Sequence, residues 1–217
     1  MKLFILVLRK EWLAFRRAAT SIFGVLLYLL SVLFICAFVF EPNEEHLNFG
    51  IGLFWFILLF VALQAHQMIF NTSQKTRFYD YTLFPSVLLL GAKLLQQSIL
   101  LFLLFLSTAF FYWFLLWQQN ILEFSWILLL FLAALGFSGI LTLLTALATR
   151  SSGTLGLLAV LGLPLMLPFL MLLIRSSTYL FNNLTTIFWQ ENLIFLITID
   201  IISLGLGLIL FPYLWRD

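Results

Sequence analysis

The sequence predicts an all-α polytopic membrane protein, in which six transmembrane helices follow an amphipathic N-terminal interfacial helix. Of the 217 residues, 64% are hydrophobic and only 9% are charged, whereas charged residues make up about a quarter of a soluble domain. Apolar runs of about 20 residues, the length that crosses a hydrocarbon core of about 30 Å, recur along the chain with short polar breaks. We expect one membrane domain over residues 1–217.

Residues 1–20 are predicted to form the interfacial helix. Phe4, Leu8, Trp12 and Phe15 recur at helical spacing and form one apolar stripe. Lysine and arginine side chains fall on the adjoining face. A helix with this pattern lies in the plane of the membrane surface and contacts lipid. The spans that follow are expected at about 21–40, 49–70, 93–117, 125–149, 155–174 and 192–214.

Basic residues predict the orientation of these spans. With six spans, ten of the eleven lysines and arginines fall on one side, and only Arg175 falls on the other. Because basic loops stay in the cytoplasm, both termini are expected there, in a bacterial inner (plasma) membrane. The ten residues are Lys2, Arg9, Lys10, Arg16, Arg17, Lys75, Arg77, Lys93, Arg150 and Arg216. A net charge of +2 gives no indication of nucleic-acid binding.

The longest cytoplasmic connection, residues 71–92, is the predicted coupling loop. Its centre mixes charges with aromatic side chains before Pro85, which ends any helix that precedes it. No GxxxxGK[ST] motif occurs in the sequence, so any ATP-driven work needs a partner ATPase, and no enzyme activity is expected. The loop either docks such a partner or is anchored at the interface by its tyrosines. The docking residues would be Arg77, Phe78, Tyr79, Asp80, Tyr81 and Phe84.

The segment Gly136-Phe137-Ser138-Gly139 allows two interpretations. In an intramembrane rhomboid protease, a GxSG serine is the nucleophile and needs a histidine base. The two histidines here are His46, in an outer loop, and His66, in the second span, and the sixth span has none. The favoured interpretation is therefore that the small residues allow helices to approach closely.

Two ionisable residues inside predicted spans are candidates for function, because such groups are costly in lipid. They are His66 and Asp200, although a structural role is favoured for both. Asp200 is expected either to pair with Arg175 or to snorkel through a local water defect. His66 is a weak candidate for haem ligation, because the sequence offers no second axial ligand to go with it. Glu44, Glu45 and His46 more closely fit a solvated loop than a metal site.

The fifth span contains Pro164 and Pro168, four residues apart. Each proline removes one backbone hydrogen bond, so this span should be kinked. Since the freed carbonyls avoid lipid, their face is expected to point into the bundle. The fifth span is therefore a predicted hinge or cavity wall, or else a bent packing helix.

Several segments together resemble the CcmB family, the haem exporter protein B permeases of the cytochrome c maturation system. They are the basic segment Leu8-Arg9-Lys10-Glu11-Trp12, Trp55 in the second span, and the connection from Arg77 through Phe84-Pro85 to Lys93. The last part runs from Leu135-Gly136 through Thr149-Arg150-Ser151-Ser152-Gly153-Thr154-Leu155 into the Leu-Pro-(x)3-Pro span.

The resemblance implies an ABC-2/exporter-like membrane subunit, with haem as a transported or handled ligand of the complex and no cofactor assigned to this chain. It would couple ATP hydrolysis by a partner to haem export or to release of a haem-loaded periplasmic chaperone. The implied partners are a cytoplasmic ATPase (CcmA-like), a haem-handling membrane subunit (CcmC-like), a small subunit (CcmD-like), lipid and a second copy of this chain. The alternatives are a generic ABC-2-type permease for lipid, polysaccharide or drug, an intramembrane hydrolase, and a membrane scaffold.

Overall fold

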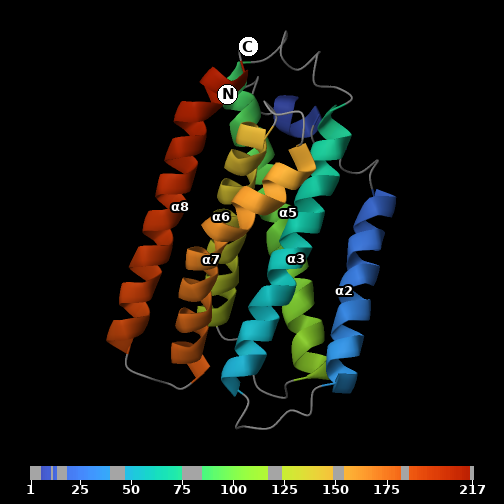
Figure 1. Ribbon diagram of the computed structural model, residues 1–217, viewed down its shortest axis with the longest axis vertical. Helices are drawn as coiled ribbons and strands as arrows, with labels where there is room; N and C mark the ends of the chain where they lie inside the picture. Colours follow the sequence, from blue (N-terminus) through green and yellow to red (C-terminus); the bar gives the residue numbers. More distant parts are fainter. Residues whose placement is uncertain are drawn as a thin grey trace.

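A computed structural model of the chain describes residues 6–10, 12–13, 19–39, 47–74, 85–116, 124–148, 154–181 and 186–215. Six long helices run alternately up and down the molecule (Figure 1). They are α2 (Ala19–Val39), α3 (Leu47–Gln74), α5 (Ser86–Leu115), α6 (Phe124–Ala148), α7 (Thr154–Phe181) and α8 (Thr186–Trp215).

Five of these helices are long and apolar enough to cross a membrane, namely α3, α5, α6, α7 and α8. In α2 the described apolar stretch, Phe23–Val39, is shorter. The predicted all-helical polytopic class is thus supported by five long apolar helices among the described residues, and the sixth span stays a prediction. At a rise of about 1.5 Å per residue, helices of 28 residues such as α3 and α7 reach about 42 Å, more than a hydrocarbon core requires.

The predicted coupling loop over residues 71–92 is helical at both ends. Helix α3 continues to Gln74, because no proline or glycine interrupts its polar last turn. Helix α5 begins directly after Pro85, whose φ of −60° and ψ of 134° place it just outside the helix. A proline there loses no helical hydrogen bond. Lys93, expected at the cytoplasmic edge, is therefore in the second turn of α5 and only 4% exposed.

The helices that contain the predicted fifth and sixth spans are longer than those spans. Helix α7 extends beyond residue 174 to Phe181, and α8 begins at Thr186. Arg175, expected at a boundary, is consequently within α7. Polar residues are tolerated there because their hydroxyl groups bond to carbonyls of the preceding turn, as Ser176 does to Leu172 and Ser177 does to Leu173.

Helix α6 lies at the centre of the bundle and packs against α8, α7, α5 and α3. A chain of buried aromatic rings crosses the bundle from α5 through α6 to α7. The ring of Phe137 meets Phe105 at 5.8 Å and Phe169 at 5.3 Å between centroids, both edge to face. This geometry is the favourable one for aromatic pairs, so the chain of rings fixes α6 between its neighbours.

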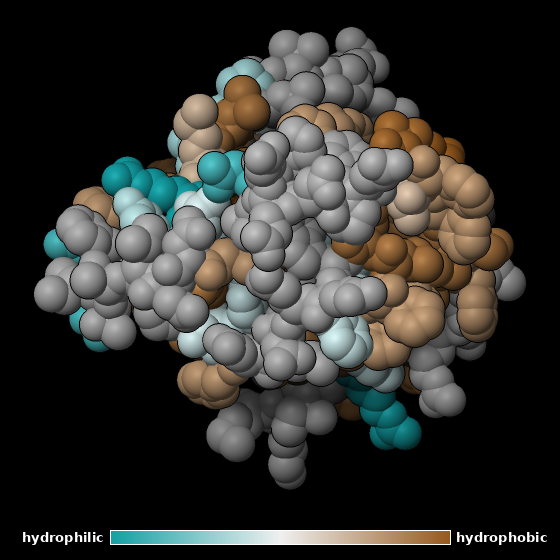
Figure 2. All heavy atoms as spheres, turned by 90° about the horizontal axis from the view of Figure 1, so that it is seen from below, coloured by the Kyte–Doolittle hydropathy of each residue, from teal (hydrophilic) through white to brown (hydrophobic). Residues whose placement is uncertain are grey.

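Large apolar side chains cover the outside of the bundle, including Phe38 at 83%, Phe124 at 80% and Met171 at 72% exposure. Figure 2 shows such residues around the lower end of the molecule. A soluble monomer rarely exposes so much contiguous apolar surface. This apolar surface is suited to contact with lipid chains.

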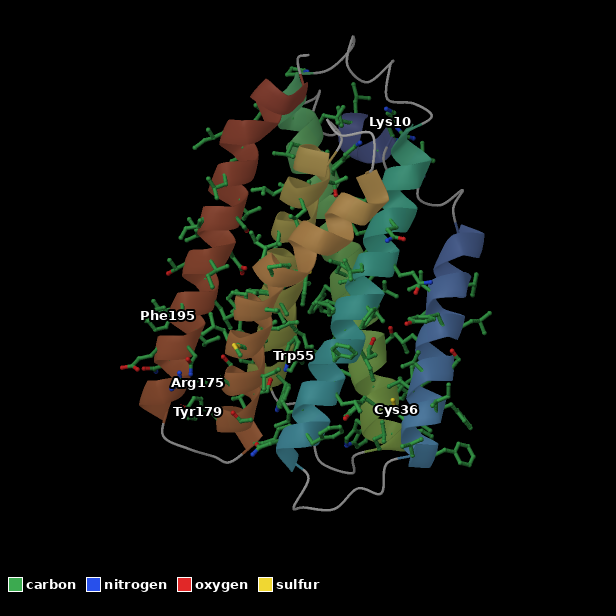
Figure 3. The ribbon with its side chains drawn as sticks, viewed as in Figure 1. Lys10, Cys36, Trp55, Arg175, Tyr179 and Phe195 are labelled. Atoms are coloured by element: carbon green, nitrogen blue, oxygen red, sulfur yellow. The ribbon has the colours of Figure 1, made fainter. Side chains whose placement is uncertain are left out.

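The described part of the N-terminal segment is helical at residues 6–10 and 12–13. Lys10 lies at the upper end of the molecule (Figure 3), where α8 also ends (Figure 1). Val7 is fully buried, whereas Trp12, on the predicted apolar stripe, is 41% exposed. The rest of the predicted interfacial helix lies outside the described residues.

Candidate functional site

The predicted coupling residues, Arg77 to Phe84, lie outside the described residues. Glu44, Glu45 and His46 also lie outside them. The candidate sites that the structure does describe are polar groups buried between the helices.

The first site joins α3, α5 and α6 around His66. The His66 side chain is 1% exposed, and its Nε2 lies 2.5 Å from Thr145 Oγ1 on α6. The Thr145 hydroxyl donates its hydrogen to Leu141 O at 2.7 Å. We therefore assign the hydrogen of the shorter contact to His66 Nε2, with Thr145 as the acceptor. Gln97 on α5 also hydrogen-bonds the His66 side chain.

Helix α5 carries further buried polar side chains close in sequence to Gln97. Lys93, Gln96 and Gln97 are 4%, 3% and 2% exposed. Buried lysines and amides require hydrogen-bond partners. Sequence analysis noted His66 but missed Thr145 and Gln97. The available signal was the spacing of Ser138, Thr142 and Thr145, which places three hydroxyl groups on one stripe of an otherwise apolar helix.

The second site is the carboxyl group of Asp200, near the middle of α8. Asp200 is 5% exposed, and neither carboxyl oxygen has a hydrogen-bond partner in the described part of the chain. One oxygen, Oδ1, points at the backbone of Gly136 on α6. A charge at the centre of a bilayer costs at least about 2.5 to 3.5 kcal/mol, so this group is expensive unless it is neutral or paired.

The expected pair of Asp200 with Arg175 is wrong. The Nε of Arg175 instead donates to the hydroxyl group of Tyr179 at 3.3 Å. Figure 3 shows this pair together on the lower part of α7. Arg175 precedes Tyr179 by one helical turn, so the two side chains share a face of α7.

The glycines of α6 bring α8 into close contact. A Cβ added at Gly136 would collide with the Phe169 ring and the Asp200 carboxyl group. At Gly139 an added Cβ would lie 2.6 Å from Ser203 Oγ. The interpretation of Gly136 and Gly139 as close-packing residues is therefore confirmed.

Ser138 is not placed as a protease nucleophile among the described residues. Its hydroxyl group donates to Leu94 O on α5 at 3.1 Å. His66, the described histidine, contacts Thr145 instead. A serine nucleophile needs its base within hydrogen-bonding reach, and the arrangement in this part of the chain does not provide one.

The proline face of α7 points outward, and the prediction that it lines the bundle is wrong. Pro164 and Pro168 are both exposed, whereas Met166 and Phe169 are buried. The reason is that α7 turns its larger apolar side chains toward α6 and thereby places the prolines on the opposite side. Figure 1 shows that α7 changes direction along its length, as expected for two internal prolines.

A metal site was not expected from the sequence, since the outer acidic loop more closely fits a solvated loop. Over the described ranges, no group of three or more histidine, cysteine, aspartate or glutamate side chains is placed to hold a metal ion. Cys36 is a free, half-buried thiol on α2.

The fold and the buried polar groups define a class, the polytopic α-helical membrane protein. Comparison with family models, with curated proteins and with solved structures finds no match to this chain.

Proposed function

We propose that this chain is the membrane (permease) subunit of an ABC-type complex for cytochrome c maturation. It would couple ATP hydrolysis by a separate cytoplasmic ATPase to haem export or to release of a haem-loaded periplasmic chaperone. Similarity of its segments to the CcmB family motivates the specific role. The remaining partners would be the haem-handling and small subunits and a second copy of this chain.

The observation that carries the coupling role is the link between α3 and α5. Helix α3 runs past its apolar window, Asn48–Gln67, as far as Gln74. Helix α5 begins at Ser86, and Gln97 of α5 bonds to His66 of α3 inside the bundle. Two long helices joined in this way can transmit a displacement from residues 75–85 to α6 through Thr145.

The proposed membrane topology has six spans, with α2 as the first and the upper end of Figure 1 in the cytoplasm. Support comes from the alternating directions of the six helices and from the common end of Lys10 and the end of α8. The positive-inside rule then assigns that end to the cytoplasm of a bacterial inner membrane.

Deletion of the gene, followed by haem staining of membrane c-type cytochromes, tests the maturation role. We expect covalent haem staining to be lost and to return with the plasmid-borne gene. Normal staining would exclude the role and leave a generic ABC-2-type permease as the alternative. The purified chain is expected to hydrolyse no ATP, and a cytoplasmic ATPase is expected to co-purify with it.

The docking part of the proposal needs its own variants. Charge reversal at Arg77 and Asp80, combined with Tyr79→Ala and Tyr81→Ala, should release the ATPase while the bundle stays folded. Arg150→Glu serves as a control in another connection on the same proposed side. Co-purification that survives the fourfold change would refute docking at this loop.

A further inference from the structure

We propose that Asp200 is a proton-binding site within the membrane domain, and that it holds its proton while α8 is packed on α6. The proposal rests on the contact between these two helices. It does not depend on the transport role proposed above.

The position of Asp200 favours a neutral acid. Its side chain is 5% exposed and lies near the middle of the apolar stretch Gln190–Ile209. Its Oδ1 points at Gly136, beside the ring of Phe169. Within the part of the chain that the structure describes, no donor reaches either carboxyl oxygen. A carboxylate buried without donors or a cation is strongly disfavoured, whereas the protonated acid is tolerated.

The titratable groups on the neighbouring helices do not compensate a charge on Asp200. Helix α6 has none between Phe124 and Ala148. On α7, Arg175 interacts with Tyr179, and on α5, Tyr112 donates to Gly50 O at 2.8 Å. Lys93 of α5 is buried, and Glu191 and Tyr213 lie on α8 itself. Over the described ranges, no ion pair joins any of these groups to Asp200.

Close packing couples the proton to the helix contact. Gly136 and Gly139 bring the backbone of α6 so near to Asp200 and Ser203 that an added Cβ would collide. Both carboxyl oxygens of Asp200 are inaccessible to solvent in this packed arrangement. The carboxyl group can release its proton to water, leaving a carboxylate, only after α8 has separated from α6. Conversely, protonation allows the two helices to close.

The low number of aspartates makes a direct test possible. The chain has three, Asp80, Asp200 and Asp217. The full chain, labelled with ¹³C-carboxyl aspartate and reconstituted in lipid vesicles, is examined by infrared spectroscopy at neutral pH. We expect a labelled band of protonated carboxylic acid that disappears in Asp200→Asn and persists in Asp80→Asn and Asp217→Asn. A spectrum with labelled carboxylate bands alone, or an acid band that survives in Asp200→Asn, would overturn the proposal.

A second experiment measures the helix contact itself. A Cβ at position 139 would lie 3.4 Å from Ser203 Cβ, close to the separation of about 3.5 to 4.5 Å found in disulfides. Gly139→Cys and Ser203→Cys are therefore combined in a Cys36→Ser background, and disulfide formation is followed under oxidation at neutral and mildly alkaline pH.

The same pair of cysteines in an Asp200→Asn background is the matched control, because the thiol chemistry is identical. We expect the cross-linking yield of the protein that retains Asp200, relative to the Asp200→Asn control, to fall severalfold as the pH rises. Equal yields across the pH range would contradict the coupling between the proton and the helix contact.

Discussion

The indole Nε1 of Trp55 on α3 donates a 2.7 Å hydrogen bond to Ser177 Oγ on α7, although the two residues are 122 positions apart in the chain. The Ser177 hydroxyl group in turn donates to Leu173 O at 2.8 Å. Both polar groups are buried, and Figure 3 shows Trp55 between the two helices. This bond therefore fixes the lower half of α7 against α3.

Removal of the Trp55 bond should destabilise the bundle by a modest amount. Side-chain hydrogen bonds between membrane helices contribute about 0.6 kcal/mol on average and at most about 1.7 kcal/mol. Ser177→Ala and Trp55→Phe, alone and together, are compared by reversible unfolding in detergent. We expect a coupling energy of about 1 kcal/mol between the two sites. Fully additive effects would show that the bond contributes nothing to stability.

A methyl group added at Gly136 should lower the stability of the bundle far more than one added at Gly205. Gly136→Ala places a Cβ against the Phe169 ring and Asp200, and the ring is held by Phe137. Overpacking of this kind costs about 1 to 3 kcal/mol. Gly205→Ala on α8 is the matched control, because nothing lies within 4 Å of its added Cβ.

The measurement for the glycine pair is the midpoint of thermal unfolding in detergent. We expect the midpoint to decrease clearly for Gly136→Ala. For Gly205→Ala the free energy of unfolding should change by no more than about 1 kcal/mol, since alanine is the better helix former. Equal midpoints for the two variants would contradict the close packing of α6 on α8.

The helical class and the approximate position of each long helix could be predicted from the sequence, because long apolar runs have few alternatives in lipid. The ends of the helices were harder to predict from the sequence. The polar turn up to Gln74 and the turn after Pro85 have the composition of a loop, yet both are helical. Hydropathy records the boundary of the membrane, whereas the helix itself continues beyond it.

The candidate sites were predictable only as single residues. His66 and Asp200 stood out as ionisable groups in apolar spans, but their neighbours depend on how helices rotate against one another. The orientation of Pro164 and Pro168 was predicted wrongly for that reason. Hydrophobic periodicity gives little help here, because all faces of these helices are apolar.

The outward proline face of α7 gives a prediction about function that rests on the proposed transport role. Pro164→Ala with Pro168→Ala restores two backbone hydrogen bonds without changing buried Met166 or Phe169. We expect an unfolding midpoint that is unchanged or higher, together with reduced haem staining, because α7 can no longer bend. Leu167→Ala, exposed between the prolines, is the control and should retain normal staining. Full staining in the double variant would make the bend a packing feature only.

The contact of His66 with Thr145 is expected to contribute more to stability than a hydroxyl group within one helix. Thr145→Val removes the acceptor of His66 Nε2 and leaves a buried donor, at a cost of about 1 to 3 kcal/mol. Thr142→Val is the matched control, since the Thr142 hydroxyl group donates to Ser138 O at 2.6 Å within α6. Unfolding in detergent should show a larger loss of unfolding free energy for Thr145→Val than for Thr142→Val. His66→Leu combined with Thr145→Val should recover part of that loss, because the buried His66 donor is then absent and only Gln97 is left without its His66 partner. A double variant less stable than the sum of the single changes would show that the site is held by Gln97 and not by Thr145.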